Sequence, residues 1–138
     1  MRADDTNELI VRAIVLASAA REHAYAPYSQ FRVGAAVATA DGRLFAGANV
    51  ENASFGLTAC AERVALWTGT VAGASDFILV VVVTDTRQPV TPCGACRQVL
   101  SELAPEALVV MTTLGGLRQD ATVKELLPGA FGRRDLTS

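Results

Sequence analysis

The chain has 138 residues, of which 51% are hydrophobic and 19% are charged, and its formal net charge at pH 7 is −2. A chain of this length can bury one core, so we expect a single domain over residues 1–138. The weakly acidic balance, without a dense run of Lys and Arg, argues against a nucleic-acid partner. The longest apolar run, residues 77–83, is too short to cross a bilayer.

Hydrophobic periodicity and turn residues divide the chain into alternating elements. Apolar residues recur at helical spacing near the N-terminus until the turn at Pro27, and Asp41-Gly42 is a hairpin signal. A near-continuous apolar run up to Thr84 is typical of a strand buried on both faces. In chain order, we expect a helix at 6–23, strands at 31–39 and 44–49, a loop at 52–57, a helix at 60–72 with Thr58 as a possible cap, a strand at 77–84, a helix at 94–103, a strand at 107–112 and a helical turn at 123–127. This order predicts an α/β sandwich around one central mixed sheet.

The N-terminus, the cysteines and the apolar content bear on location and assembly. Asp4 and Asp5 stand where an export signal needs basic residues. Three cysteines cannot all pair within one chain, so we expect free thiols in a reducing cytoplasm. A high apolar fraction without a membrane span predicts surface that is buried between subunits, that is, a homo-oligomer.

All three cysteines lie in two short segments, Cys60-Ala61-Glu62-Arg63 and Pro92-Cys93-Gly94-Ala95-Cys96-Arg97. Both segments open a predicted helix, where the partial positive charge of the helix N-terminus favours thiolates. Three thiolates can fill three corners of a zinc tetrahedron and leave the fourth for water, as in catalytic zinc sites. Cys60, Cys93 and Cys96 are therefore the candidate zinc ligands, and Glu62 is a natural partner for the water.

Other uses of these residues compete with a catalytic zinc site. A Cys-x-x-Cys pair alone also serves redox chemistry or plain packing, and an acid such as Glu62 often only complements a helix dipole. A closed structural zinc site needs a fourth protein ligand, and the only histidine, His23, lies in the first predicted helix without a ligand-like neighbour. A non-catalytic, zinc-stabilised binding module is the alternative from another functional class. Three cysteines instead of four, with Glu62 beside one of them, argue against it.

The two segments match the signature of the zinc deaminases of nucleobases, which is His or Cys, one residue, Glu, and then Pro-Cys-x-x-Cys. Zinc lowers the pKa of a bound water to roughly 7. Glu62 would take a proton from this water, deliver it to the ring nitrogen beside the attacked carbon, and then help to protonate the departing amine. Arg63 and Arg97, each next to a ligand segment, could offset the thiolate charge by hydrogen bonding to sulfur.

Longer stretches outside the zinc segments also match: residues 26–36, residues 49–56 and Leu127-Pro128-Gly129-Ala130-Phe131. Within them, Pro27-Tyr28-Ser29-Gln30-Phe31 and Asn49-Val50-Glu51 narrow the match to enzymes that act on nucleosides. With them, the chain resembles the small homotetrameric cytidine deaminases of pyrimidine salvage over almost its whole length. The resemblance implies a three-layer α-β-α sandwich with one central mixed five-stranded sheet and one Zn²⁺ per subunit. It also implies hydrolytic deamination of cytidine and deoxycytidine to uridine and deoxyuridine, with release of ammonia.

The resemblance also implies roles for individual residues. It makes Cys60, Cys93 and Cys96 the zinc ligands and Glu62 the proton shuttle. The implied substrate contacts are Asn49 and Glu51 to the ribose hydroxyls, Phe31 to the pyrimidine ring, the backbone of Ala61 to the base, and Phe55 and Phe131 reaching in from neighbouring subunits. Phe55 stands where many relatives have tyrosine, so a hydroxyl contact would be missing there. Taken singly, the polar residues are ordinary loop residues and the aromatic ones are more often core.

The substrate class can also be argued from charge. A nucleotide deaminase needs a cationic phosphate grip, and a polynucleotide editor needs a basic groove with stacking aromatics. This acidic chain offers neither clearly, and Glu51 would repel a nearby phosphate. Free cytidine and deoxycytidine fit best. A deaminase of aminonucleoside antibiotics is the nearest rival, and the Asn49-Val50-Glu51-Asn52 pattern argues against it.

Overall fold

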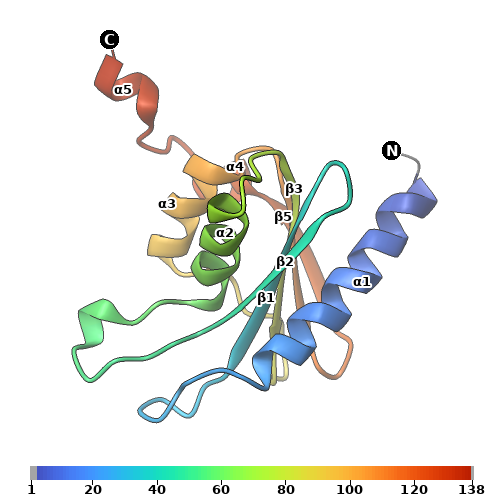
Figure 1. Ribbon diagram of the computed structural model, residues 1–138, viewed down its shortest axis with the longest axis vertical. Coiled ribbons are helices and arrows are strands. Elements are labelled where there is room, and N and C mark those ends of the chain that lie inside the picture. Colours follow the sequence, from blue (N-terminus) through green and yellow to red (C-terminus); the bar gives the residue numbers. More distant parts are fainter. Residues whose placement is uncertain (1–2, 138) are drawn as a thin grey trace.

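The computed structural model describes residues 3–137, in which five strands form one mixed sheet (Figure 1). The strand order is β2-β1-β3-β4-β5; β3 and β4 are parallel, and the other neighbours are antiparallel. The elements are α1 (Ala3–Arg21), β1 (Val33–Thr39), β2 (Leu44–Ala48), the 3-10 turn η1 (Phe55–Leu57), α2 (Ala61–Val71), β3 (Phe77–Thr84), α3 (Gly94–Leu103), β4 (Leu108–Thr113), β5 (Arg118–Thr122), α4 (Val123–Leu126) and α5 (Arg133–Thr137).

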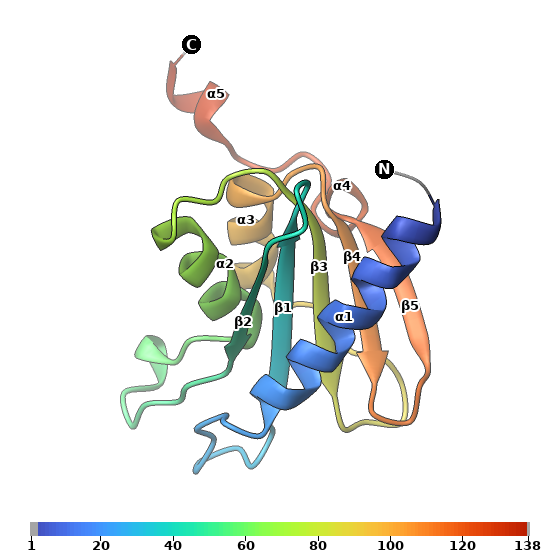
Figure 2. The same cartoon turned by 45° about the vertical axis from the view of Figure 1, so that its right-hand side comes forward.

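Helices cover both faces of the sheet, which confirms the expected three-layer α/β sandwich. Figure 2 shows α1 across one face and α2 and α3 on the other. The apolar stripe of α1, from Leu9 to Ala17, packs on Leu79 and Val81 of β3, whereas Leu66 and Leu100 pack on Val80 from the opposite side. The strand β3 is therefore buried on both faces, as its continuous apolar run predicts. In the described part of the chain, no helix has the length and apolar character of a membrane span.

A glycine in β2 fixes how closely α2 approaches the sheet. A Cβ atom at Gly47 would lie 2.4 Å from the backbone nitrogen of Ala65 and 2.6 Å from the carbonyl oxygen of Ala61. Real Cβ atoms essentially never lie this close to a non-bonded neighbour, so only glycine lets the first turns of α2 rest on β2. Because Cys60 and Glu62 lie at the start of this helix, the close approach positions both of them.

The sheet has the five strands that the resemblance implies, but its last strand is missing from the elements expected from periodicity. Residues 118–122 form β5, which pairs with β4 from Arg118↔Thr112 to Thr122↔Leu108. Four of its five residues are exposed, so the segment lacks the apolar alternation that marks a strand. The free edge of β4 provides the backbone partners instead. A salt bridge of 2.7 Å joins Arg118 to Asp120 on the same face.

Several element ends also differ from the prediction. Thr58 does not cap α2: the N-cap is Cys60, and its side chain makes no capping hydrogen bond. The first helix begins earlier and ends earlier than expected, at Ala3 and Arg21. Its first turn carries acids and its last turn Arg21, which complements the helix dipole at both ends. The short elements η1 and α5 lie in segments without a periodic signal.

Candidate functional site

The three cysteine side chains converge where α2 and α3 begin. Cys60 and Cys93 are the N-cap residues of these helices, and Cys96 lies in the first turn of α3. Their sulfur atoms all lie within 4.8 Å of one another, and Cys60 Sγ is 3.9 Å from Cys93 Sγ. Sulfurs bound to one tetrahedral zinc ion at about 2.3 Å are about 3.8 Å apart, so the three thiols fit zinc with only small adjustment.

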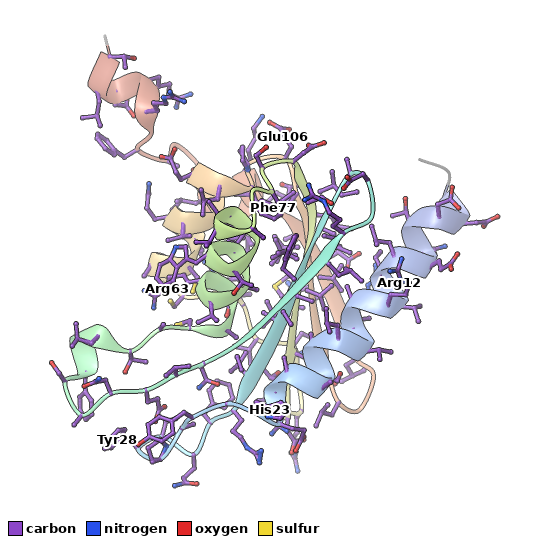
Figure 3. All side chains as sticks on the ribbon, viewed as in Figure 1. Arg12, His23, Tyr28, Arg63, Phe77 and Glu106 are labelled. Carbon is purple, nitrogen blue, oxygen red and sulfur yellow. The ribbon has the colours of Figure 1, made fainter. Side chains whose placement is uncertain are left out.

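No histidine fills the fourth corner of the candidate zinc site, which agrees with the open position expected from the sequence. His23 follows α1 and lines a separate hollow with Leu16 and Ala46. Figure 3 shows it at the end of α1, apart from Arg63 on α2. Within residues 3–137, the metal-binding group consists of the three cysteines alone. This arrangement has the three-ligand pattern of a catalytic zinc site with an open corner.

The thiols of Cys60 and Cys96 have pKa values that are shifted in opposite directions. The pKa of Cys60 is lowered to about 5, mainly by hydrogen bonding with Cys96. The hydrogen bond from Arg63 and the positive charge of that side chain lower it further. Hydrogen bonding with Cys60, followed by burial, raises the pKa of the Cys96 thiol. In the metal-free chain, Cys60 is therefore the thiolate and Cys96 holds the proton. Zinc binding has to displace the proton of Cys96.

The two neighbouring arginines make different contacts. Arg63 Nη2 donates to Cys60 Sγ at 3.3 Å and to the carbonyl oxygen of Thr58 at 3.4 Å. Arg97 donates from Nε to the carbonyl oxygen of Pro92 and from Nη1 to that of Leu126, both at 2.7 Å. Arg63 is therefore the arginine in contact with a ligand sulfur, whereas the hydrogen bonds of Arg97 tie the start of α3 to the end of α4.

Glu62 lies in the first turn of α2 with a relative exposure of 5%. Burial raises the pKa of its carboxyl group, and the negative charge of Cys60 adds to this effect. A raised pKa makes a carboxyl group a better proton acceptor, and a proton shuttle has to accept a proton before it releases it. Its position two residues from a thiol ligand fits that use.

Glu62 and two of the thiols line a cavity of about 300 Å³. This size is at the lower end of the range for small-molecule pockets. The cavity brings together most of the site residues expected from the sequence: its lining consists of Ser29, Phe31, Val33, Asn49, Glu51, Thr58, Cys60, Ala61, Glu62, Val82, Thr84, Val90, Thr91 and Cys93. The acidic groups in this lining are the carboxyl groups of Glu51 and Glu62 and the thiols of Cys60 and Cys93, with no Lys or Arg among these described residues.

Asn49 and Glu51 both make hydrogen bonds to the segment that carries Phe31. Asn49 Oδ1 accepts from the backbone N–H of Val33 at 2.8 Å, and its Nδ2 donates to the carbonyl oxygen of Phe31 at 2.7 Å. Glu51 Oε1 accepts from the backbone N–H groups of Tyr28 and Ser29, and Oε2 accepts from the Ser29 hydroxyl. Each polar side chain therefore fixes the wall of the cavity and keeps further hydrogen-bonding capacity.

Phe55 and Phe131 are not part of the cavity lining in this chain. Phe55, in η1, makes an edge-to-face contact with Tyr28 at 6.0 Å between ring centroids and is 74% exposed. Phe131 is 59% exposed, and its carbonyl oxygen accepts from Gln98 Nε2 at 2.9 Å. The C-terminal segment that follows extends away from the sheet and ends in α5 (Figure 1).

Several cavity residues were not predicted from the sequence. Ser29 lies inside the segment from Pro27 to Phe31, but nothing in the spacing assigns its hydroxyl to Glu51. Thr84, Val90 and Thr91 come from the end of β3 and from the loop before Cys93. Loop residues of this kind carry no periodic signal, so only the fold brings them to the cavity.

A larger hollow, of about 560 Å³, lies along α4 and the C-terminal segment. Its charged lining residues are Lys124, Arg133 and Arg134. It contains none of the thiols and no carboxylate. Glu62 and two of the three thiols therefore lie in the smaller cavity instead.

Comparison with known proteins places this arrangement in context. The family model described as "Cytidine and deoxycytidylate deaminase zinc-binding region" matches residues 8–112. The chain is 54% identical over 118 residues to a cytidine deaminase of Halalkalibacterium halodurans, with 85% of this chain and 89% of that protein covered. It is 44% identical over 129 residues to one of Sporosarcina psychrophila, covering 93% and 95%. The crystal structure of cytidine deaminase from Burkholderia pseudomallei superimposes with a TM-score of 0.84 at 51% identity, covering 87% of this chain and 97% of that one.

Proposed function

The chain belongs to the cytidine and deoxycytidylate deaminase family, and on that premise we propose that it hydrolyses cytidine and deoxycytidine to uridine and deoxyuridine with release of ammonia. The observation that carries this proposal is the convergence of three thiols, within 4.8 Å, beside the buried carboxyl group of Glu62. Cys60, Cys93 and Cys96 hold the zinc ion. When bound there, zinc supplies a nucleophile at neutral pH by lowering the pKa of water to roughly 7.

Glu62 moves the protons of the reaction. It accepts a proton from the attacking water and delivers it to the ring nitrogen next to C4, while the oxygen of the water bonds to C4. It then transfers the second proton of the water to the amine, the C4–N bond breaks, and ammonia leaves. The raised pKa of the Glu62 carboxyl supports its role as the proton acceptor.

The remaining cavity residues give the site specificity for a free nucleoside. Asn49 and Glu51 hold the sugar hydroxyls, Phe31 stacks near the pyrimidine ring, and the backbone of Ala61 reads the base. The lining supports this assignment, because its residues include no Lys or Arg to bind a nucleotide phosphate, and Glu51 would repel it. A volume of about 300 Å³ also fits a single nucleoside better than a strand of nucleic acid.

We further propose that residues 1–138 form one deaminase domain, and that four copies assemble into a cytoplasmic homotetramer of pyrimidine salvage. Large apolar side chains with high exposure, such as Val71 at 88% and Leu57 at 71%, support burial against other copies. In this assembly, Phe55 and Phe131 reach the cavities of neighbouring subunits. Their exposure in the single chain supports that role.

A substrate panel tests the proposed function. Zinc-loaded protein is mixed with cytidine, deoxycytidine, CMP or an aminonucleoside antibiotic, and turnover is followed by ultraviolet absorbance and ammonia release. We expect turnover of the two free nucleosides and little of CMP. Zinc-loaded protein that acts on no cytosine compound would favour a non-catalytic binding module, and preferential turnover of the antibiotic would identify the rival deaminase.

A further inference from the structure

Ser29 occupies the centre of a hydrogen-bond network between Glu51 and Phe31. Its hydroxyl donates to Glu51 Oε2 and accepts from the backbone N–H of Phe31 at 3.0 Å. Its own backbone N–H donates to Glu51 Oε1 at 3.1 Å, beside that of Tyr28 at 2.9 Å. One serine therefore contacts both the acid on the sugar side of the cavity and the aromatic residue on the base side.

The backbone around Ser29 is bent so that this network can form. Gln30 has a φ of +62°, which is uncommon for a residue other than glycine. Its backbone N–H donates to the carbonyl oxygen of Ala26 at 3.0 Å, and its side chain donates to that of Pro27 at 3.1 Å. Unusual backbone conformations of this kind tend to lie at functional sites, where surrounding contacts stabilise them. Here the bend turns the N–H of Phe31 back toward the Ser29 hydroxyl.

The direction of these hydrogen bonds determines what Glu51 can do. A hydroxyl group has one proton to donate. Because the N–H of Phe31 donates to the Ser29 oxygen, the hydroxyl proton is left for Glu51. With the two backbone N–H groups, the carboxylate accepts three hydrogen bonds, and that from the Ser29 hydroxyl does most to lower the pKa of Glu51. Glu51 is therefore ionised and can only accept a hydrogen bond from a ligand.

We infer that Ser29 is a positioning residue that gives the site its preference for a hydroxyl-bearing sugar, by holding Glu51 as a fixed acceptor and Phe31 in place beside it. The inference rests on the proposed role of Glu51 in holding the ribose. Without the Ser29 hydroxyl, Glu51 is held through Oε1 alone, by two backbone N–H groups. Such a side chain would lose more rotamer freedom when it binds the sugar, which weakens binding. The alternative is that Ser29 only stabilises the turn. In that case its substitution would affect substrates with and without these sugar hydroxyls equally.

The test compares a substrate that has sugar hydroxyls at C2′ and C3′ with one that lacks them. The value of kcat/KM is measured for cytidine and for 2′,3′-dideoxycytidine, at high enzyme concentration for the latter, with full-length, zinc-loaded wild-type protein and Ser29→Ala. Loss of a hydrogen bond to a charged group predicts a decrease of about 10- to 100-fold for cytidine, mainly through KM. The decrease for dideoxycytidine should be at least about tenfold smaller, because that substrate offers Glu51 no hydroxyl.

Matched variants separate positioning from folding. Ser29→Thr retains a hydroxyl group and should restore most of the cytidine activity. Ser75→Ala alters an exposed serine of the loop before β3 and should leave both substrates unchanged. If Ser29→Ala does not fold, the same ratio is taken from Ser29→Cys, whose thiol keeps the shape of the side chain but donates weakly.

Equal losses on the two substrates would overturn the inference and leave Ser29 a purely structural role. No loss on cytidine would overturn it as well. Failure of the proposed function looks different, because the wild-type protein would then turn over neither nucleoside. Zinc content, measured in every variant, shows that the metal centre is unchanged.

Discussion

The Nη2 atom of Arg63 donates to the Sγ atom of Cys60 at 3.3 Å, so the cation of one side chain lies directly against a zinc-binding thiol. The contact lies within one helix start, because Cys60 caps α2 and Arg63 is in its first turn. The guanidinium also lies over the ring of Trp67, with its carbon 5.9 Å from the ring centroid. These contacts hold Arg63 in place, and we propose on this ground that Arg63, and not Arg97, is the main neutraliser of thiolate charge.

Substitution of Arg63 should weaken zinc binding more than substitution of Arg97. Loss of a residue that hydrogen bonds to a metal ligand typically costs 10- to 100-fold in metal affinity, so we expect about this decrease for Arg63→Gln. Arg97→Gln removes hydrogen bonds to two carbonyl groups instead and should lower the free energy of unfolding by about 1–3 kcal/mol. Competition with a chelator measures zinc affinity, and unfolding by denaturant measures the free energy of unfolding. A larger affinity loss for Arg97→Gln would contradict this assignment.

Glu62→Gln should retain zinc and lose turnover. The amide keeps the size of the side chain but cannot carry a proton between water and substrate, so we expect kcat to fall by at least about 10²–10⁴-fold. Metal analysis gives the zinc content, and steady-state kinetics on cytidine give kcat. Near-normal turnover would refute the proton-shuttle role, and loss of zinc would show that Glu62 supports the metal centre instead.

Zinc affinity should increase with pH between 6 and 8. In the metal-free chain, Cys60 has a pKa of about 5 and needs no deprotonation in this range. The pKa of Cys96 is raised by its contact with Cys60, so its proton must leave when zinc binds. Each proton displaced makes the affinity increase by about tenfold per pH unit. Chelator competition at several pH values measures the slope, and a pH-independent affinity would contradict this account.

Gly47→Ala should disturb both stability and the metal centre. The added methyl group would lie 2.4 Å from the backbone of Ala65, so α2 must move away from β2. Overpacking of this kind costs about 1–3 kcal/mol of unfolding free energy, and we expect zinc affinity to fall with it because α2 carries Cys60. The control is Gly115→Ala, whose nearest contact would be an ordinary 3.7 Å. Unchanged thermal unfolding of Gly47→Ala, or an equal decrease in the unfolding temperature of the control, would disprove the close-approach argument.

Mixed oligomers can show whether Phe131 acts on a neighbouring subunit. Phe131→Ala retains Glu62, and Glu62→Gln retains Phe131, so co-expressed subunits can rebuild complete sites only if Phe131 reaches across an interface. An equal mixture should then have about a quarter of its sites intact. A mixture of Glu62→Gln and Cys96→Ser is the control, because both residues serve the same chain and no site is restored. Absence of recovery in the first mixture would place Phe131 in its own subunit or outside the reaction.

The sequence by itself determined the metal chemistry and most of the layered fold. Ligand spacing and helix starts are local properties, so the order of residues along the chain is enough to group Cys60, Cys93 and Cys96 with Glu62. Burial on both faces leaves a continuous apolar run, and the run from Phe77 to Thr84 therefore predicted the central strand correctly. Zinc binding and the three-layer α/β fold are both confirmed.

Only the tertiary structure decided the features that depend on partners distant in the chain. The polar strand β5 forms because β4 offers it backbone hydrogen bonds, which its own side chains do not signal. The different contacts of Arg63 and Arg97 also depend on the fold. Both residues lie next to a ligand segment in the sequence, but Arg63 contacts the sulfur of Cys60 and Arg97 contacts backbone carbonyl groups. The link from Ser29 to Glu51 spans two loops. Side-chain periodicity records burial, whereas a hydrogen-bond partner depends on where the backbone places each group in space.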